Sequence, residues 1–263
     1  MGLECRKIGY FCGSVASFKD QIDFNNLPNH IAVIMDGNGR WAMKKGAARI
    51  FGHRNAIQAV TEVTEACGEL GIRYLTLYAF STENWGRPKD EVDGLMELLV
   101  NTLKKELSNL MENQIRLTTI GDLSHLPDLC QKNLRDAISA TRNNTGLHVI
   151  LALNYSGRWE LTKAVRQIAL DVKSGRLDAD RIDEQAVAAH LETAGIPDPE
   201  LLIRTSGELR VSNFLLWQIA YTELYITKTL WPDFRKEDLY EAIYSYQHRD
   251  RRFGKILEPN AEA

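Results

Sequence analysis

The sequence has few cysteines and no long apolar run. Its four cysteines, at positions 5, 12, 67 and 130 of 263 residues, form no CxxC pair and no spacing typical of metal ligands. A disulfide framework is therefore not expected, and a reducing compartment, the cytoplasm, fits the composition best. No apolar stretch approaches the ~20 residues that a helix needs to cross a bilayer.

A strong excess of positive charge is also missing. The chain carries 32 Lys and Arg against 35 Asp and Glu, which gives a formal net charge of −3. Proteins that bind nucleic acids generally carry a strongly basic domain, so we expect no nucleic-acid partner. The fingerprints GxGxxG, GxxxxGKS/T, HExxH and GxSxG are absent. Their absence excludes the dinucleotide-binding, P-loop, zincin and nucleophile-elbow classes.

From Pro28 onward, short apolar runs alternate with segments of helical periodicity. The pattern predicts strands at 31–35, 74–80, 115–120, 147–153 and 201–204, and helices around 56–70, 92–110, 128–142, 161–172, 183–194 and 236–248. This alternation predicts a single α/β domain with a mostly parallel sheet that helices cover on both faces. We expect the domain to span residues 28–257, between a loose N-terminal leader (1–27) and a C-terminal tail (258–263).

Ligands of such sheets bind beyond the carboxyl ends of the strands. That rule selects the segments 36–40, 81–87, 154–158 and 204–212, which are also the segments richest in polar residues and glycine. Two independent observations thus indicate the same edge of the sheet.

The segment from Asp36 to Trp41 follows the first predicted strand. Glycines at 37 and 39 allow a ligand to approach the backbone N–H groups, and the N-terminus of a following helix would favour phosphate. Residues 40–54 hold five cationic residues (Arg40, Lys44, Lys45, Arg49 and Arg54), His53 and no acidic residue. The pattern favours an anion site, and a glycine turn followed by a solvated basic helix is an equally good interpretation.

Asp36 has three possible roles: magnesium ligand, acid or base, or helix cap. A lone carboxylate among arginines suits Mg²⁺, which is commonly shared with substrate phosphate oxygens. Enzymes that form an aspartyl phosphate have a second Asp two residues later, where Asn38 stands in this chain.

A second candidate anion site comprises Arg204, Arg210 and Ser212. The planar guanidinium matches phosphate oxygens, and a serine hydroxyl can donate a further hydrogen bond. Arg87 could join either cluster. Two cationic clusters indicate two phosphorylated substrates.

The amphipathic helix expected over 92–110 permits two interpretations. Its apolar face could belong to an ordinary core or line a lipid tunnel, and periodicity does not separate them.

Several longer motifs carry a resemblance to a known family. These motifs are Asp36-Gly37-Asn38-Gly39-Arg40-Trp41-Ala42, Phe51-Gly52-His53, residues 78–88 (YAFSTENWGRP), residues 154–159 (NYSGRW) and residues 204–214 (RTSGELRVSNF). Together and in this order they resemble the cis-prenyltransferases, especially the bacterial undecaprenyl diphosphate synthases, over about residues 28–257.

The resemblance implies an enzyme that condenses isopentenyl diphosphate repeatedly onto farnesyl diphosphate with cis double bonds. The implied product is a long polyprenyl diphosphate, undecaprenyl diphosphate, for the lipid carrier of cell-wall synthesis. The family also implies a Mg²⁺ cofactor and an α/β homodimer with an apolar tunnel. Because the substrates are soluble and the product is not, we expect a cytoplasmic enzyme that contacts the inner face of the membrane transiently.

The resemblance also assigns roles by position. Asp36 is catalytic and binds Mg²⁺, Glu223 is a further metal ligand, and Asn84 is named as the proton acceptor, although its amide suits orientation better than acting as a base. The residues assigned to the allylic substrate are Gly37, Asn38, Gly39, Arg40, Trp41, Arg49 and His53. Further substrate contacts are assigned to Ser81, Thr82, Glu83, Trp85 and Arg87. Isopentenyl diphosphate is assigned to Arg204, Arg210, Val211 and Ser212.

Two positions depart from the family pattern. Ser206-Gly207 stands where a glycine pair is usual, and Leu209 stands where many bacterial members have His. Two rival functions are a non-catalytic partner subunit of the same family and a phosphate-ester hydrolase. The partner subunit is disfavoured by the presence of Asp36, Asn84, Arg204 and Arg210.

Overall fold

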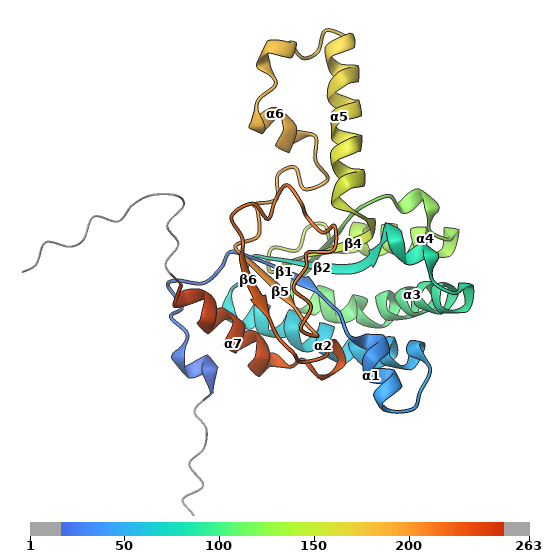
Figure 1. The fold of residues 1–263 in the computed structure, drawn as a ribbon, viewed down its shortest axis with the longest axis vertical. Helices are drawn as coiled ribbons and strands as arrows, with labels where there is room; N and C mark the ends of the chain where they lie inside the picture. Colours follow the sequence, from blue (N-terminus) through green and yellow to red (C-terminus); the bar gives the residue numbers. More distant parts are fainter. Residues whose placement is uncertain (1–16, 250–263) are drawn as a thin grey trace, which may run out of the picture.

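Six strands form one sheet in the computed structural model, which describes residues 17–249 of the chain. Their order is β3-β4-β2-β1-β5-β6, and every neighbouring pair is parallel. The strands span His30–Ile34 (β1), Tyr74–Ser81 (β2), Arg116–Ile120 (β3), His148–Tyr155 (β4), Leu201–Arg204 (β5) and Glu223–Ile226 (β6). The predicted α/β domain with a parallel sheet is confirmed (Figure 1).

Seven α-helices accompany the sheet within the described residues. They span Asn38–Lys44 (α1), Arg49–Leu70 (α2), Lys89–Glu112 (α3), Asp128–Thr141 (α4), Gly157–Lys173 (α5), Glu184–Ala189 (α6) and Lys236–Gln247 (α7), and short 3-10 helices lie at Phe18–Gln21, Thr82–Gly86, Leu123–His125, Ala179–Arg181 and Trp231–Asp233. Every expected helix and strand is present, although α2 begins earlier and α6 ends earlier than predicted. No helix in this part of the chain is both long and apolar enough to cross a membrane.

Strand β6 was missing from the prediction. It is only four residues long, lies at the edge of the sheet and is not fully buried at any position. A short edge strand needs no continuous apolar run, so the sequence pattern carries little sign of it.

Helices α2, α3, α4 and α7 cover one face of the sheet (Figure 1). Alternate strand residues, including Ile31, Val33, Leu75 and Leu77, pack against these helices and are inaccessible to solvent. Side chains alternate between the two faces of a strand, so Ala32 and Ile34 of β1 are buried on the other face. The larger of the two cores lies on the helical side.

The opposite face is covered mainly by irregular chain. Tyr155, Phe214 and Leu215 are buried there, and Trp159 in the first turn of α5 packs against them. The rest of α5 projects away from the sheet together with α6, and Val165 on α5 is 64% exposed (Figure 1). We expected helices on both faces of the sheet. On this face the only helical cover among the described residues is the start of α5.

The segment 17–27 is packed on α7, which corrects the expectation of a loose leader up to residue 27. Ile22 is buried in the main core, and the ring of Phe18 lies 5.4 Å from that of Tyr244. Apolar burial of this kind makes the segment part of the domain. Residues 1–16 of the expected leader and the expected tail 258–263 lie outside the described residues.

The register of the sheet brings the ends of three strands together. Ile34 at the end of β1 pairs with Tyr78 of β2 on one side and with Arg204 of β5 on the other. Asp36 follows β1 and Ser81 is the last residue of β2, so both reach the same edge. This is the edge at which parallel sheets bind their ligands.

Candidate active site

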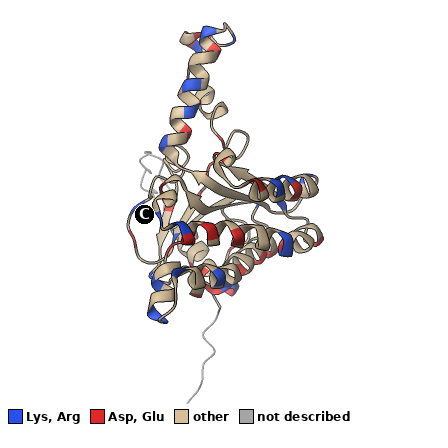
Figure 2. Cartoon of the chain, turned by 90° about the vertical axis from the view of Figure 1, so that its right-hand side faces the viewer, with Lys and Arg blue, Asp and Glu red and all other residues tan. Residues whose placement is uncertain are grey.

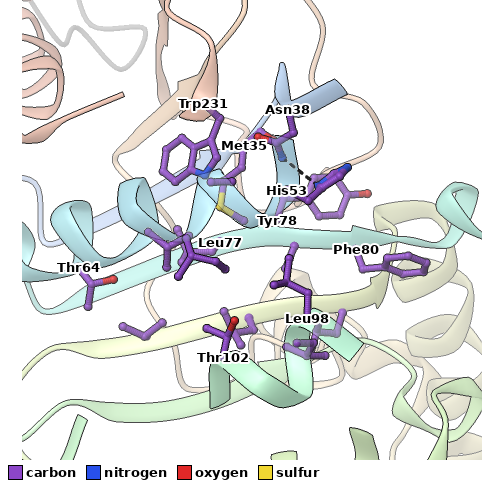
Figure 3. Close-up of a pocket in the computed structure, with 18 of the residues that line it drawn as sticks. Met35, Asn38, His53, Thr64, Leu77, Tyr78, Phe80, Leu98, Thr102 and Trp231 are labelled. Atoms are coloured by element: carbon purple, nitrogen blue, oxygen red, sulfur yellow. Dashed lines mark hydrogen bonds between the residues drawn. The ribbon is translucent and has the colours of Figure 1, made fainter. Parts of the chain in front are cut away.

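A cavity of about 1170 Å³ extends from this edge between the sheet and helices α2 and α3. Its polar end is lined by Asp36, Gly37, Asn38, Gly39, Arg49, His53, Ser81, Glu83, Asn84, Arg87, Arg204 and Ser212. Its apolar part is lined by Leu77, Leu95, Leu98, Leu99, Leu103, Leu117, Val149 and Leu151. Figure 3 shows Leu77 and Leu98 around the cavity, with Asn38 and His53 at one end.

The cavity runs along the strands from one edge of the sheet, at their carboxyl ends, to the other edge, at their amino ends. Ile115 and Leu147, which precede β3 and β4, line it at the edge opposite Asp36. One continuous space therefore joins a charged end to an apolar interior, which is the shape that an amphipathic ligand requires.

Asp36 and Arg204 form the centre of the charged end. Arg204 Nη2 donates a hydrogen bond to Asp36 Oδ2 across 2.9 Å, and the side chain of Arg204 is only 4% exposed. Thr205 fixes the backbone beside them, because its hydroxyl donates to the carbonyl of Asp36 across 2.6 Å. The strand ends of β1 and β5 are thereby tied to each other.

Asp36 stays ionised although it is partly buried. Burial by itself raises the pKa of the carboxyl, but the hydrogen bond and charge of Arg204, together with the charge of Arg40, outweigh that effect. The net result is a pKa below the ordinary value of 3.8. The site thus holds a carboxylate between two guanidinium groups at neutral pH.

The residues around Asp36 fit a Mg²⁺ ion that is shared between the protein and a substrate. In the part of the chain that the structure describes, no group of three or more His, Cys, Asp or Glu residues could hold a metal. Mg²⁺ commonly binds through one or two carboxylates and completes its coordination with water and substrate phosphates. A single ionised Asp36 therefore fits an ion shared with a substrate and does not fit a closed protein site.

Arg204 also carries the contacts that the second predicted cluster requires. Its Nη1 donates to Ser212 Oγ across 2.7 Å and to the backbone carbonyl of Arg210. The side chain of Arg210 points elsewhere: it is 64% exposed and pairs with Glu208 at 2.6 Å. Of this cluster, the cavity is lined by Arg204 and Ser212, and not by Arg210 or Val211.

Helices α1 and α2 divide the first predicted cluster between two surfaces. Arg49 and His53 line the cavity, whereas Lys44, Lys45 and Arg54 are exposed on the outside. These cationic residues are neighbours in the sequence, but only some of them bring their positive charge to the cavity.

Glycine 39 is required for the position of Arg49. A Cβ atom at Gly39 would lie 2.9 Å from Cζ of Arg49, closer than such atoms approach. The absence of a side chain at this position lets the guanidinium lie directly against α1.

Arg40 and Trp41 lie beside the cavity and do not line it. Arg40 forms ion pairs with Glu208 at 3.1 Å and Asp36 at 3.3 Å, which joins the two predicted clusters. Trp41 is buried, and its indole N–H donates to Asp233 across 2.7 Å.

A buried carboxylate that sequence reasoning missed holds the cations of the cavity. Glu91, at the start of α3, lies 3.0 Å from Arg49, 3.1 Å from Arg87 and 3.6 Å from His53. An acidic residue in the first turn of a helix is common, so the sequence gives no sign that two guanidinium groups and an imidazole converge on this one.

His53 is neutral at physiological pH. Burial, and then the charge of Arg87, lowers its pKa to about 4, against the opposing effect of Glu91. Nδ1 lies 3.3 Å from Nδ2 of Asn38, across the polar end of the cavity (Figure 3). The imidazole is therefore a hydrogen-bonding group and not a cation in this site.

The segment 81–87 forms the opposite side of the polar end. The backbone N–H of Ser81 donates to Asn84 Oδ1 across 3.2 Å, so the amide of Asn84 is oriented by its own loop. Glu83 accepts a hydrogen bond from Asn213 Nδ2 across 2.8 Å, which ties this loop to the segment after β5.

Thr82 and Trp85 do not line the cavity. The indole N–H of Trp85 donates to Asn154 Oδ1 across 2.8 Å, and its ring packs edge-on against Phe80. Trp85 therefore connects the loop to the end of β4.

Glu223 is not near Asp36 within this chain. It is the first residue of β6 and pairs in register with Leu201, whereas Arg204, beside Asp36, pairs with Ile226. Its carboxylate forms an ion pair with Arg249 at 2.9 Å. Asp36 and Glu223 lie at different edges of the sheet, so one chain cannot hold a single ion with both.

The two departures from the family pattern have different structural settings. Ser206 has φ = 74°, a left-handed conformation that glycine adopts more readily, and its hydroxyl and carbonyl both accept from Arg40. The serine thus gains a contact at a position where a glycine would be less strained. Leu209 is 87% exposed and does not line the cavity.

Comparison with known proteins decides the family. A model of the prenyltransferase family described as undecaprenyl diphosphate synthase matches residues 34–254. The chain belongs to this family. The resemblance to cis-prenyltransferases that the motifs indicated is therefore confirmed.

Relatives of the undecaprenyl diphosphate synthase family match the chain over most of its length. An isoprenyl transferase of Chlorobaculum tepidum is 55% identical over 88% of both chains. A ditrans,polycis-undecaprenyl-diphosphate synthase of Pasteurella multocida, specific for (2E,6E)-farnesyl diphosphate, is 49% identical over 90% of this chain and 99% of its own. The solved structure of lavandulyl diphosphate synthase from Lavandula x intermedia, in complex with dimethylallyl diphosphate, has a TM-score of 0.85 at 40% identity, covering 87% of this chain and 99% of that one.

Proposed function

We propose that this cis-prenyltransferase condenses isopentenyl diphosphate repeatedly onto farnesyl diphosphate and makes a long polyprenyl diphosphate, undecaprenyl diphosphate. The observation that carries the proposal is the cavity of about 1170 Å³, which joins a cationic end to an apolar interior. Both the allylic substrate and the growing product have a diphosphate head and an apolar tail. The relative from Pasteurella multocida, which is named for farnesyl diphosphate, supports the choice of primer.

In this proposal the allylic diphosphate lies on the first turn of α1, against Gly37, Asn38, Gly39 and Arg49. Backbone N–H groups at a helix N-terminus, together with a guanidinium, stabilise the negative charge that develops on the leaving group. Asp36 would hold Mg²⁺, which, when bound, neutralises part of the diphosphate charge. Glu91 keeps Arg49 and Arg87 in place on the wall of the cavity.

Isopentenyl diphosphate is proposed to bind Arg204 and Ser212, with Arg210 turning inward from its exposed position. The nucleophile is the alkene of isopentenyl diphosphate, so the protein needs no nucleophilic side chain. A proton must leave the condensed product, and Asn84 is proposed to orient the group that accepts it, because an amide is not a base near neutral pH. Each cycle pushes the lengthening tail further between α2 and α3.

The proposal extends to the setting of the enzyme. We propose a homodimeric cytoplasmic enzyme whose product serves the lipid carrier of cell-wall synthesis. Support for the dimer comes from the projecting helix α5, on which Val165 is 64% and Leu170 is 50% exposed. Exposed apolar side chains on a projecting element are typical of subunit contacts.

Incubation with labelled isopentenyl diphosphate, farnesyl diphosphate and Mg²⁺ tests the reaction. Chain-extended lipid, resolved by chromatography, supports the transferase and gives the product length. Release of phosphate without extension would support the hydrolase, and the absence of both would favour a non-catalytic partner subunit.

A further inference from the structure

The outer surface of the corner between α1 and α2 combines exposed apolar and cationic side chains. Met43 is 58% exposed and Phe51 is 43% exposed. Lys44, Lys45 and Arg54 are exposed in the same two helices and the turn between them, and they form no ion pair with the described residues. We refer to these five residues as the corner patch.

The corner patch is positively charged, whereas the whole protein carries a net negative charge. Residues 37–61 contain no acidic residue, and three of their five Lys and Arg belong to the corner patch, in a chain with a net charge of −3. Acidic residues lie instead along the long helices, as Figure 2 shows for this side of the molecule. A surface of one sign on a protein of the other sign is a local feature that favours an anionic partner.

The corner patch stands on a rigid base. The rings of Trp41 and Phe51 are stacked with centroids 5.8 Å apart, and Lys45 Nζ lies 4.2 Å from the Trp41 ring. Trp41 is itself fixed by its hydrogen bond to Asp233. One apolar and one cationic side chain of the patch, Phe51 and Lys45, are therefore held against the same buried ring, without a need to order a loop on binding.

The same two helices line the cavity on their inner side. Asn38 and Gly39 of α1, and His53 and Ile57 of α2, belong to the cavity wall. The corner patch thus lies on the outer side of the helices whose inner side faces the proposed substrates. A ligand bound at the corner patch would therefore lie close to the polar end of the cavity.

We propose that the corner patch docks on the surface of an anionic lipid bilayer. This inference rests on the proposed function in one respect, since an apolar product must reach lipid after release. Lysines bind the anionic headgroups, while Met43 and Phe51 enter the boundary between headgroups and acyl chains. Each exposed lysine strengthens partitioning roughly fivefold, and a single small patch of this kind gives a reversible contact.

Co-sedimentation with vesicles, in the absence of substrates, tests the docking. The protein is expected to bind vesicles of phosphatidylglycerol and phosphatidylcholine and to leave vesicles of phosphatidylcholine alone in solution. The double variant Lys44→Glu, Lys45→Glu should weaken binding by a factor on the order of 30 or more. The matched control is Lys104→Glu, Lys105→Glu, which makes the same charge change at two exposed adjacent lysines of α3.

The apolar part of the patch is tested in the same way. Met43→Ser should weaken binding to the anionic vesicles several-fold, whereas Met111→Ser, at an exposed methionine of α3, should not. Failure of the wild type to bind the anionic vesicles, or equal losses in the two lysine variants, would overturn the docking surface.

A separate assay keeps this proposal apart from the proposed reaction. Condensation is measured in detergent solution, where no bilayer is present. Normal condensation with no vesicle binding refutes only the proposal that the corner patch docks on a bilayer. Vesicle binding without condensation refutes only the proposed reaction. Binding that inorganic phosphate abolishes at constant ionic strength would show a free-phosphate site and would also overturn the docking surface.

Discussion

Arg204 donates a hydrogen bond to Asp36 across 2.9 Å, although the two residues are separated by 168 positions in the sequence. The pair joins the end of β1 to the end of β5 and places an ionised carboxylate beside a buried guanidinium. Each residue fixes the other, so the charged end of the cavity is formed before any substrate arrives.

Asp36→Ala is expected to abolish turnover and retain the fold. Loss of the carboxylate removes the candidate magnesium ligand, and removal of one preorganised electrostatic group typically lowers kcat by about 10²–10³-fold. Steady-state kinetics beside circular dichroism measures both effects. Asp36→Asn, which keeps the size of the side chain, is the matched control for packing, and activity of Asp36→Ala within about tenfold of wild type would contradict the assignment.

Arg204→Ala is expected to raise the KM for isopentenyl diphosphate more than Arg210→Ala does. Loss of a charge-assisted contact costs about 1.5–3 kcal/mol, or roughly 10–150-fold in affinity. Arg204 is buried and preorganised, whereas Arg210 is 64% exposed and must reorient. If both variants keep the wild-type KM for isopentenyl diphosphate, the second anion site is misplaced.

Glu91→Gln is expected to weaken use of the allylic substrate. The buried carboxylate lies 3.0 Å from Arg49 and 3.1 Å from Arg87, and the amide loses the charge that orients both. We expect kcat/KM for farnesyl diphosphate to fall by about 10–100-fold, as for the loss of a hydrogen bond to a charged group. Glu97→Gln, at an exposed glutamate of the same helix, is the control. Equal behaviour of the two variants would refute this role for Glu91.

Leu147→Trp is expected to shorten the products and to leave the first condensation almost unchanged. Leu147 is 4% exposed and lines the cavity at the edge opposite Asp36, where a growing tail would arrive last. Overpacking can cost about 1–3 kcal/mol of stability, so thermal melting accompanies product chromatography. Leu147→Met conserves volume and is the control; a folded Leu147→Trp enzyme with full-length products would place the end of the path elsewhere.

The stability of the protein is expected to fall as the pH drops from about 6.5 to about 4. Burial is the main cause that lowers the pKa of His30 from 6.5 to about 4, so the unfolded chain binds more protons than the folded one in this interval. Stability is therefore complete above pH 6.5 and is lost towards pH 4, by on the order of 3 kcal/mol for this group.

Thermal melting as a function of pH measures this effect. His30→Asn removes one titrating group and should reduce the dependence on pH, whereas His125→Asn, at an exposed histidine, should not. An unchanged pH dependence in His30→Asn would show that His30 does not contribute to acid destabilisation.

Local features of the sequence were sufficient for most of the helices and strands and for the edge that carries the site. Apolar runs and helical periodicity predicted every strand except β6, and polar segments such as 36–40 and 81–87 marked the strand ends. These features are local because strand and helix periods, and the backbone freedom of glycine, act over a few residues. The motifs in their order also identified the family.

Only the tertiary structure decided which of the predicted residues meet. The sheet register brings Arg204 to Asp36 and leaves Glu223 at the other edge. Helix rotation turns Arg49 into the cavity and Lys44 out of it. These outcomes depend on how β5 lies beside β1 and how α1 packs on α2. Such long-range packing is not encoded in the spacing of neighbouring residues, because it is settled by burial of apolar faces that lie far apart in the chain.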